Sequence, residues 1–170
     1  MHHGTAPVIR RAPLLLIATL FARSAFASPL DLLVPDILKA DQAPPELSVT
    51  IIGYQYGWRY AYPNTETDGA GECRVEGALV LPLGKRVHLS ITADDIIHEW
   101  RVPALDLKAD AIPGLLNLVA FSPAATGTFK GGATSLSGDG YGKMAFDLTV
   151  IEPDAYAAWA KGISQSCTAP

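Results

Sequence analysis

Charged residues are scarce in this chain, and neither sign dominates. Lys and Arg number 13 and Asp and Glu number 17 among 170 residues, so the formal net charge is −4. That charge is too small and too evenly spread to favour nucleic acid or an anionic membrane surface as a partner. Cysteine is almost absent, and Cys73 and Cys167 lie too far apart in the sequence to indicate a joint metal site.

Long apolar runs are also missing. The candidate nearest to a membrane span, residues 12–22, is well short of the roughly 20 residues that a spanning helix needs. Arg10 and Arg11 precede it and the small-residue stretch Ala25-Phe26-Ala27 follows it, which is typical of a signal peptide over residues 1–27. An uncleaved N-terminal anchor is the alternative. Both interpretations predict an exported chain, and in an oxidising compartment the two cysteines could form a disulfide.

Motifs of stand-alone catalysis are lacking as well. The sequence has no nucleophile-elbow motif, no phosphate-binding glycine loop followed by a helix and no paired-carboxylate signature. We therefore predict no catalytic residue, no cofactor-binding residue and no small-molecule substrate. If the chain serves an enzyme, we expect it to be a non-catalytic subunit.

Short β-rich runs separated by glycine, proline, asparagine and aspartate make up most of the chain from Glu46 onward. Apolar and polar residues alternate in four of these runs, 47–51, 58–62, 87–91 and 144–150. Alternation of this kind places one apolar face of each strand inward. The pattern predicts a single all-β sandwich or barrel.

The predicted domain covers residues 46–162 and has simple flanking segments. A connector over residues 28–45 precedes it. A closing helix is expected from Pro153 to about Lys161, because proline suits the first helical turn and Gly162 can end the helix. Residues 163–170 then form a C-terminal tail.

Several motifs in the same order resemble the extramembrane domain of subunit II of the haem-copper oxidases. They are Gly53-Tyr-Gln-Tyr-Gly-Trp-Arg-Tyr60, Asp95-Ile-Ile-His-Glu-Trp-Arg-Val-Pro103, Lys108-Ala-Asp-Ala-Ile-Pro-Gly114 and Gly127-Thr-Phe-Lys-Gly131. The similarity runs from Glu46 to Lys161. It implies a cupredoxin-like Greek-key β-barrel, an exported location and a catalytic partner subunit in the membrane.

The resemblance fails at the positions that hold copper in this family. Copper-bearing members continue with Gln-Cys-x-Glu-x-Cys-Gly-x-x-His-x-x-Met, and residues 132–144 keep that spacing without insertion or deletion. Ala133 and Ser137 replace the two bridging cysteines, Ser135 the glutamate and Tyr141 the second histidine. Neither a methyl group nor a neutral hydroxyl can replace a bridging thiolate. The resemblance therefore implies a degenerate binuclear copper site.

Two of the family's copper ligands remain, His98 and Met144. An imidazole and a thioether together suit one Cu(I) ion, so these two residues are the candidates for a residual metal site. The simpler interpretation makes His98 a hydrogen-bonded strand histidine near the end of the barrel. The simpler interpretation of Met144 is a core residue that fills an irregular gap.

Further departures concern the contacts with other proteins. Tyr56 stands where the family has the tryptophan near the cytochrome c docking surface, and Leu115 stands where it has arginine, so cytochrome c is not expected as the direct electron donor.

Aromatic residues at every second position of residues 54–62 predict one aromatic-rich strand, in the core or at a subunit interface. Lys108 and Asp110, which could form a loop ion pair or a turn contact, belong to a loop that the family places against the catalytic subunit. The interface candidates are Tyr56, Trp58, Lys108 and Asp110.

The sequence thus predicts an exported, subunit-II-like component of a respiratory haem-copper oxidase, with a structural or assembly role and no cofactor of its own. The alternative is a stand-alone periplasmic copper-binding or copper-delivery protein that holds one copper ion with His98 and Met144. A third hypothesis is a cupredoxin-like domain recruited to an unrelated binding role.

Overall fold

The computed structural model describes residues 44–65 and 71–168. The predicted signal peptide and nearly all of the connector lie outside these residues. Among the described residues, no helix is long and apolar enough to cross a membrane. The strands are β1 (Leu47–Tyr54), β2 (Gly57–Pro63), β3 (Glu72–Glu76), β4 (Leu79–Pro82), β5 (Val87–Ala93), β6 (His98–Val102), β7 (Leu107–Ala111), β8 (Asn117–Phe121), β9 (Gly127–Gly131) and β10 (Phe146–Ile151).

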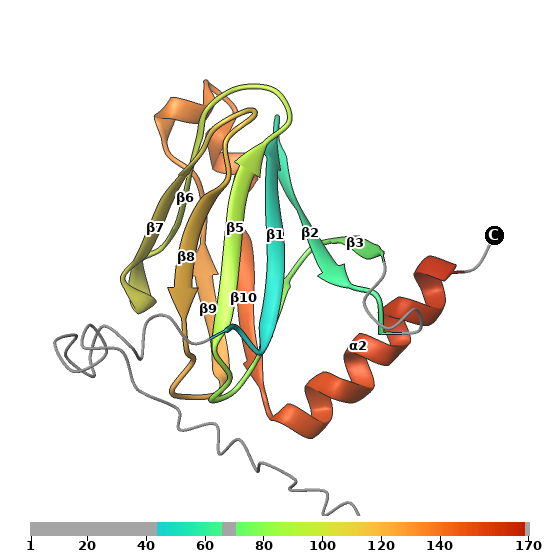
Figure 1. Ribbon diagram of the computed structural model, residues 1–170. Helices are drawn as coiled ribbons and strands as arrows, with labels where there is room; N and C mark the ends of the chain where they lie inside the picture. The colour runs from blue at the N-terminus through green and yellow to red at the C-terminus, as the bar shows by residue number, and fades with distance from the viewer. Residues whose placement is uncertain (1–43, 66–70, 169–170) are drawn as a thin grey trace, which may run out of the picture. The chain divides into compact units, whose positions relative to one another are not determined.

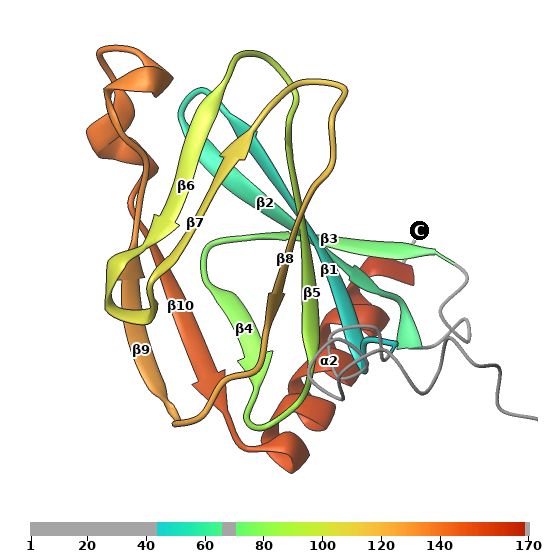
Figure 2. The ribbon, with the colours of Figure 1, turned by 60° about the vertical axis from the view of Figure 1, so that its left-hand side comes forward.

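The strands form three sheets around one core, as the predicted all-β cupredoxin-like fold requires (Figures 1 and 2). One sheet has the order β3-β2-β1-β5-β8, the second β4-β10-β9, and β6 pairs with β7. β1 and β5 are parallel, as are β4 and β10, and the other pairs are antiparallel. The alternation predicted for residues 87–91 is confirmed, because Val87, Leu89 and Ile91 are buried and the residues between them are half-buried.

The residues predicted as one aromatic-rich strand form a hairpin instead. β1 ends at Tyr54 and β2 begins at Gly57, and these two residues pair across a turn made by Gln55 and Tyr56. Trp58, Tyr60 and Tyr62 are buried, whereas Tyr56 in the turn is exposed. The aromatic stripe is therefore divided between the core and the tip of a hairpin.

Aromatic rings fill the core between the sheets. The rings of Trp100 and Phe146 stack with their centroids 5.6 Å apart, and Phe146 meets Trp58 edge to face at 5.9 Å. The ring of Phe146 also lies over Gly131, directly across the β9–β10 pair. A Cβ atom at position 131 would overlap this ring. Glycine at this position lets the backbone approach the aromatic core.

The closing helix α2 (Pro153–Thr168) is longer than predicted, because it passes through Gly162 and takes up most of the expected C-terminal tail. Trp159 packs on Tyr62 with ring centroids 4.9 Å apart. Further along, the Ser164 hydroxyl accepts hydrogen bonds from the backbone N–H (3.1 Å) and hydroxyl (2.9 Å) of Thr65. Tertiary contacts of this kind outweigh the modest cost of one glycine inside a helix.

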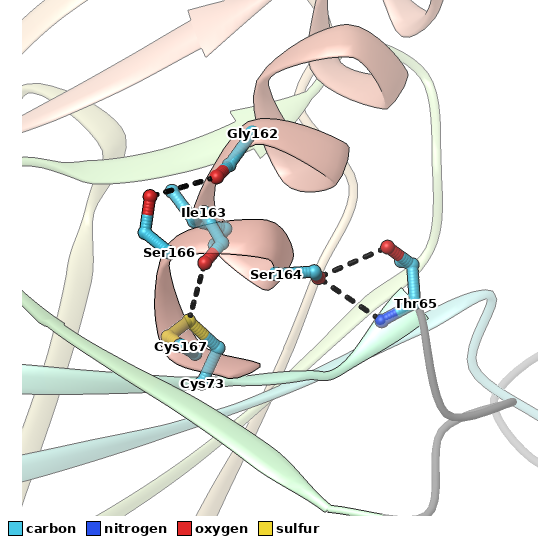
Figure 3. Close-up of a disulfide and its surroundings, with 7 residues drawn as sticks. All are labelled: Thr65, Cys73, Gly162, Ile163, Ser164, Ser166 and Cys167. Atoms are coloured by element: carbon cyan, nitrogen blue, oxygen red, sulfur yellow. Dashed lines mark hydrogen bonds between the residues drawn. A yellow bond between two sulfur atoms is a disulfide. The ribbon is translucent and has the colours of Figure 1, made fainter. Parts of the chain in front are cut away.

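A disulfide holds the last turn of α2. Cys73 in β3 is bonded to Cys167, and their Cα atoms lie 5.5 Å apart (Figure 3). The pairing that the sequence left open is thus present. Together with the Ser164–Thr65 hydrogen bonds, it fixes the end of the helix against the β2–β3 region.

Four connections meet at one end of the barrel, which we call the loop end. They are the β1–β2 turn, the β5–β6 loop, the β7–β8 loop and the long β9–β10 loop with its two 3-10 helices, η3 (Ser135–Ser137) and η4 (Tyr141–Met144). Both views show these connections at the top, and the start of β1 and helix α2 lie lower down (Figures 1 and 2). The predicted metal-site residues all belong to this end.

Candidate metal centre

His98 begins β6 at the loop end and is fully buried. Its Nε2 lies 2.7 Å from Oδ1 of Asp95, three residues earlier. The ring meets Trp58 edge to face, with centroids 6.0 Å apart. A Cβ atom at position 53 would come within 2.9 Å of both rings, so Gly53 leaves the space in which they pack. The predicted hydrogen-bonded strand histidine matches this geometry.

Asp95 ties three segments of the loop end together. Its carboxylate accepts hydrogen bonds from the backbone N–H groups of Gln55 and Ile96, each 2.7 Å long, in addition to its contact with His98. Partial burial opposes ionisation of this carboxyl, but the hydrogen bonds from His98, Ile96 and Gln55 outweigh burial and lower its pKa. Asp95 was not among the predicted site residues. Its spacing of three residues from His98 was the available signal.

The Asp95 contact determines which nitrogen of His98 carries the proton. An ionised carboxylate only accepts hydrogen bonds, so Nε2 donates and, in the neutral ring, Nδ1 holds the lone pair. That Nδ1 is buried and has no hydrogen-bond partner among the described residues. In its neutral form, His98 therefore presents an unpaired imidazole lone pair inside the loop end.

The β9–β10 loop places the residues that align with the family's copper ligands in different environments. Ala133 and Ser137 are buried, and the Ser137 hydroxyl has no hydrogen-bond partner among the described residues. Ser135 and Tyr141 are exposed, so the tyrosine does not take the place of an inward-facing imidazole. Met144 is fully buried in the core cluster, as its simpler interpretation predicts.

A binuclear copper centre does not fit these residues. Two bridging thiolates are needed to hold two soft copper ions, and the two bridging positions carry a methyl group and a neutral hydroxyl. Within residues 44–65 and 71–168, no group of three or more His, Cys, Asp or Glu side chains is placed to hold a metal ion. Among the described residues of this region, His98 Nδ1 and the Thr134 and Ser137 hydroxyls are buried without a hydrogen-bond partner, and the Met144 side chain is fully buried.

The β1–β2 hairpin anchors this loop through direct contacts. Gln55 donates from Nε2 to the Ser137 carbonyl at 3.3 Å, and Trp58 donates from Nε1 to the Met144 carbonyl at 2.9 Å. The Tyr56 ring covers Gly140 so closely that a Cβ atom there would lie 2.5 Å from it. The loop is thus attached to the hairpin at three points by contacts within the chain.

The predicted interface residues are not all on the surface. Trp58 is only 4% exposed and belongs to the core, so it cannot present its ring to a partner, whereas Tyr56 is 39% exposed. Lys108 and Asp110 lie on strand β7 and do not form the predicted ion pair. Lys108 instead lies 2.9 Å from a carboxylate oxygen of Glu99 on the neighbouring strand. Glu99 is buried and was not among the predicted site residues.

The family match and the most similar known proteins indicate the same protein family. The family described as the periplasmic domain of cytochrome c oxidase subunit II matches residues 67–151. Cytochrome c oxidase subunit 2 of Cereibacter sphaeroides is 32% identical over 84% of the chain and 56% of its own length. The corresponding protein of Thermostichus vulcanus is 31% identical over the whole chain and 51% of its own length. The chain thus spans about half the length of these relatives.

A solved structure agrees with the sequence relatives. The periplasmic domain of subunit II of cytochrome oxidase from Bradyrhizobium japonicum superposes with a TM-score of 0.66 at 28% identity. The match covers 74% of the chain and 99% of that domain. The described β-domain is therefore similar in extent to a complete subunit II periplasmic domain.

Proposed function

Because the chain belongs to the cytochrome c oxidase subunit II family, we propose that it is an exported structural or assembly subunit of a membrane-bound haem-copper oxidase. In this role it carries no electrons through a copper centre of its own. Oxygen reduction belongs to a haem-bearing catalytic subunit in the membrane, which is its partner. The chain contributes binding surface and stability to that complex.

The substitution of both thiolate positions is the observation that supports this role. Ala133 and Ser137, which the family's spacing aligns with the bridging cysteines, are both buried, and neither a methyl group nor a neutral hydroxyl can bind copper as a thiolate does. The hydrogen bonds from Gln55 and Trp58 hold the same loop against the β1–β2 hairpin.

An exported location follows from two further features. The matched family is a periplasmic domain, and the chain carries a disulfide between Cys73 and Cys167. Disulfides form and persist mainly in oxidising compartments. We therefore place the chain outside the cytoplasm, attached to the membrane by its partner subunit or by an N-terminal anchor.

Copper content and haem retention together test the proposal. The purified full chain is loaded with Cu(I) or Cu(II), desalted and measured for bound copper and visible absorption. In parallel, the tagged chain is recovered from solubilised membranes of its own cell and measured for haem per chain. We expect the purified chain to be colourless and to hold no tightly bound copper. We expect the chain recovered from membranes to carry haem through its partner subunit. An intensely coloured chain with two copper ions would contradict the proposed role.

A second function is supported by the unpaired Nδ1 of His98. This buried lone pair and the buried Met144 thioether are donors that suit a single Cu(I) ion. On this basis the chain would be a periplasmic copper-binding or copper-delivery protein. One retained copper ion per chain would favour this function, and its loss in both His98→Ala and Met144→Ala would assign it to these residues. Copper retained in both variants would place it elsewhere.

A further inference from the structure

Strand β8 forms one edge of the five-stranded sheet and carries no charge. It is the last strand in the order β3-β2-β1-β5-β8, so among the described residues no strand pairs with its other side. Residues 111–129, which include all of β8, have no charged side chain. Soluble proteins commonly protect such edges with charges or proline, because the free N–H and C=O groups of an edge strand can pair with another chain. β8 itself has neither protection.

The surface beside this edge is uncharged as well. Across the β8–β5 pair, Leu118 lies beside Ser90 and Ala120 beside His88. Leu118 is 61% exposed, and the two residues of β5 are half-buried. Figure 1 views the sheet from this side, with β8, β5 and β1 in front of β9 and β10. The outward-facing residues of β5 and β8, which we call the neutral edge, are His88, Ser90, Thr92, Leu118 and Ala120.

Charges of both signs border the neutral edge, mostly as ion pairs within the chain. The pairs are Glu46–Lys85 at 2.8 Å, Arg59–Asp94 at 2.9 Å, Glu99–Lys108 at 2.9 Å and Lys130–Asp147 at 2.6 Å. Arg86, Asp106 and Asp110 add further charges of both signs. Two copies that meet through this edge therefore bury no charge and do not oppose surfaces of a single sign.

We infer that the neutral edge binds a second copy of this chain, with the two β8 strands side by side and antiparallel about a two-fold axis. Such pairing satisfies the free backbone groups of both strands, which lipid tails cannot do. In a two-fold contact the same patch of both copies meets, so a patch without charge is self-complementary. With Val119 on the axis, Leu118 of one copy faces Ala120 of the other, a large side chain beside a small one. The inference goes beyond the proposed function and does not depend on it.

The size of the contact indicates a weak dimer. β8 has five residues. A strand of this length and its neighbours bury less than the roughly 800 Å² per partner of a standard interface. We therefore expect a dissociation constant of about 10–100 µM for the dimer of the full chain.

Sedimentation velocity of the full chain tests the inference. The native chain and Leu118→Lys are compared from about 1 to 500 µM, a range that spans the expected dissociation constant, at pH 8, where an ordinary histidine is neutral. A lysine at position 118 occurs twice in a two-fold contact, so we expect the dissociation constant to rise by about tenfold or more. Leu136→Lys is the matched control, because Leu136 is 60% exposed but lies in the β9–β10 loop; it should dimerise like the native chain. An equimolar mixture of Leu118→Lys and Leu118→Glu should restore the dimer, since opposite charges then meet.

Several outcomes would overturn the inference. A native chain that stays monomeric at every concentration would do so. A dimer that Leu118→Lys leaves unchanged would place the interface elsewhere, and a dimer that Leu136→Lys weakens equally would be non-specific. Circular dichroism shows whether each variant is folded, and Leu118→Ala provides a milder change if the lysine variant is not. A monomeric native chain whose haem, after recovery from membranes, is lost in Leu118→Lys would assign this face to an oxidase subunit instead.

Discussion

The disulfide between Cys73 and Cys167 should contribute a large part of the stability of the domain. It joins strand β3 to the last turn of helix α2 and so closes a loop across a sequence separation of 94 residues. In the loop-entropy model, a closed loop of this length lowers the conformational entropy of the unfolded chain, which raises the free energy of the unfolded state by roughly 4.7 kcal/mol at 25 °C. Measured values for native disulfides are about 2–5 kcal/mol.

We therefore expect Cys73→Ala/Cys167→Ala to lower the free energy of unfolding by about 3–5 kcal/mol. For a domain of this size, that corresponds to a fall in the melting temperature of roughly 10–20 °C. Urea denaturation followed by circular dichroism measures the difference. The native chain unfolded with reductant is the control, because reduction removes the cross-link and leaves both sulfur atoms in place.

Two outcomes would refute this reasoning. A difference below about 1 kcal/mol between the native chain and the double variant would mean that loop closure contributes little. A large loss in the double variant without a similar loss in the reduced native chain would assign the effect to packing around Cys73 rather than to the cross-link. The contacts of Trp159 and Ser164 should keep the helix docked in both cases, so amide exchange should rise mainly in its last turn.

Three further predictions concern the loop end. Trp58→Phe keeps an aromatic ring but leaves the buried Met144 carbonyl without its donor, so the free energy of unfolding should fall by about 1–3 kcal/mol; an equal fall in Trp159→Phe would contradict a specific role of this hydrogen bond. The Asp95 carboxyl has a lowered pKa, so the stability that its charge supplies is present above the unfolded value near pH 3.9 and is lost as the pH falls through the lower folded value. The stability difference between the native chain and Asp95→Asn, measured in urea at pH 7 and at pH 3, should therefore shrink at the acid pH, and a constant difference would show that shape rather than charge matters. Finally, Ala133→Cys/Ser137→Cys/Tyr141→His restores the ligand types at the family's spacing, so copper retained after desalting should exceed that of the native chain; no gain would show that the loop no longer has the geometry for copper.

Local patterns in the sequence predicted the sheets well but not their connections. Strict alternation identified β5 and β10, because one face of each must be buried. The hairpin at Gln55 and Tyr56 was missed, since its turn has no Asn-Gly or Asp-Gly pair and the aromatic alternation continues through it. The end of the helix was misplaced because the contacts that carry it past Gly162 come from Cys73 and Thr65, far away in the sequence.

The candidate site was predicted in composition but not in geometry. The spacing of residues 132–144 predicts which positions correspond to the family's copper ligands, and that correspondence stays a prediction. It could not show that Asp95 leaves Nδ1 of His98 unpaired, because a tautomer depends on a hydrogen bond in space. Nor could it show that Trp58 is buried while Tyr56 is exposed, since this difference arises only where the chain turns.

The contact between Gly131 and Phe146 makes the order of mutations matter. Because the ring occupies the space where a Cβ atom would lie, alanine at position 131 is expected to be harmful while position 146 holds phenylalanine. After a change to a smaller side chain at position 146, the same alanine could fill part of the space left behind. The two positions are directly paired across β9 and β10, so their effects should not be additive. A library that varies only one of them would exclude combinations that the barrel can accommodate.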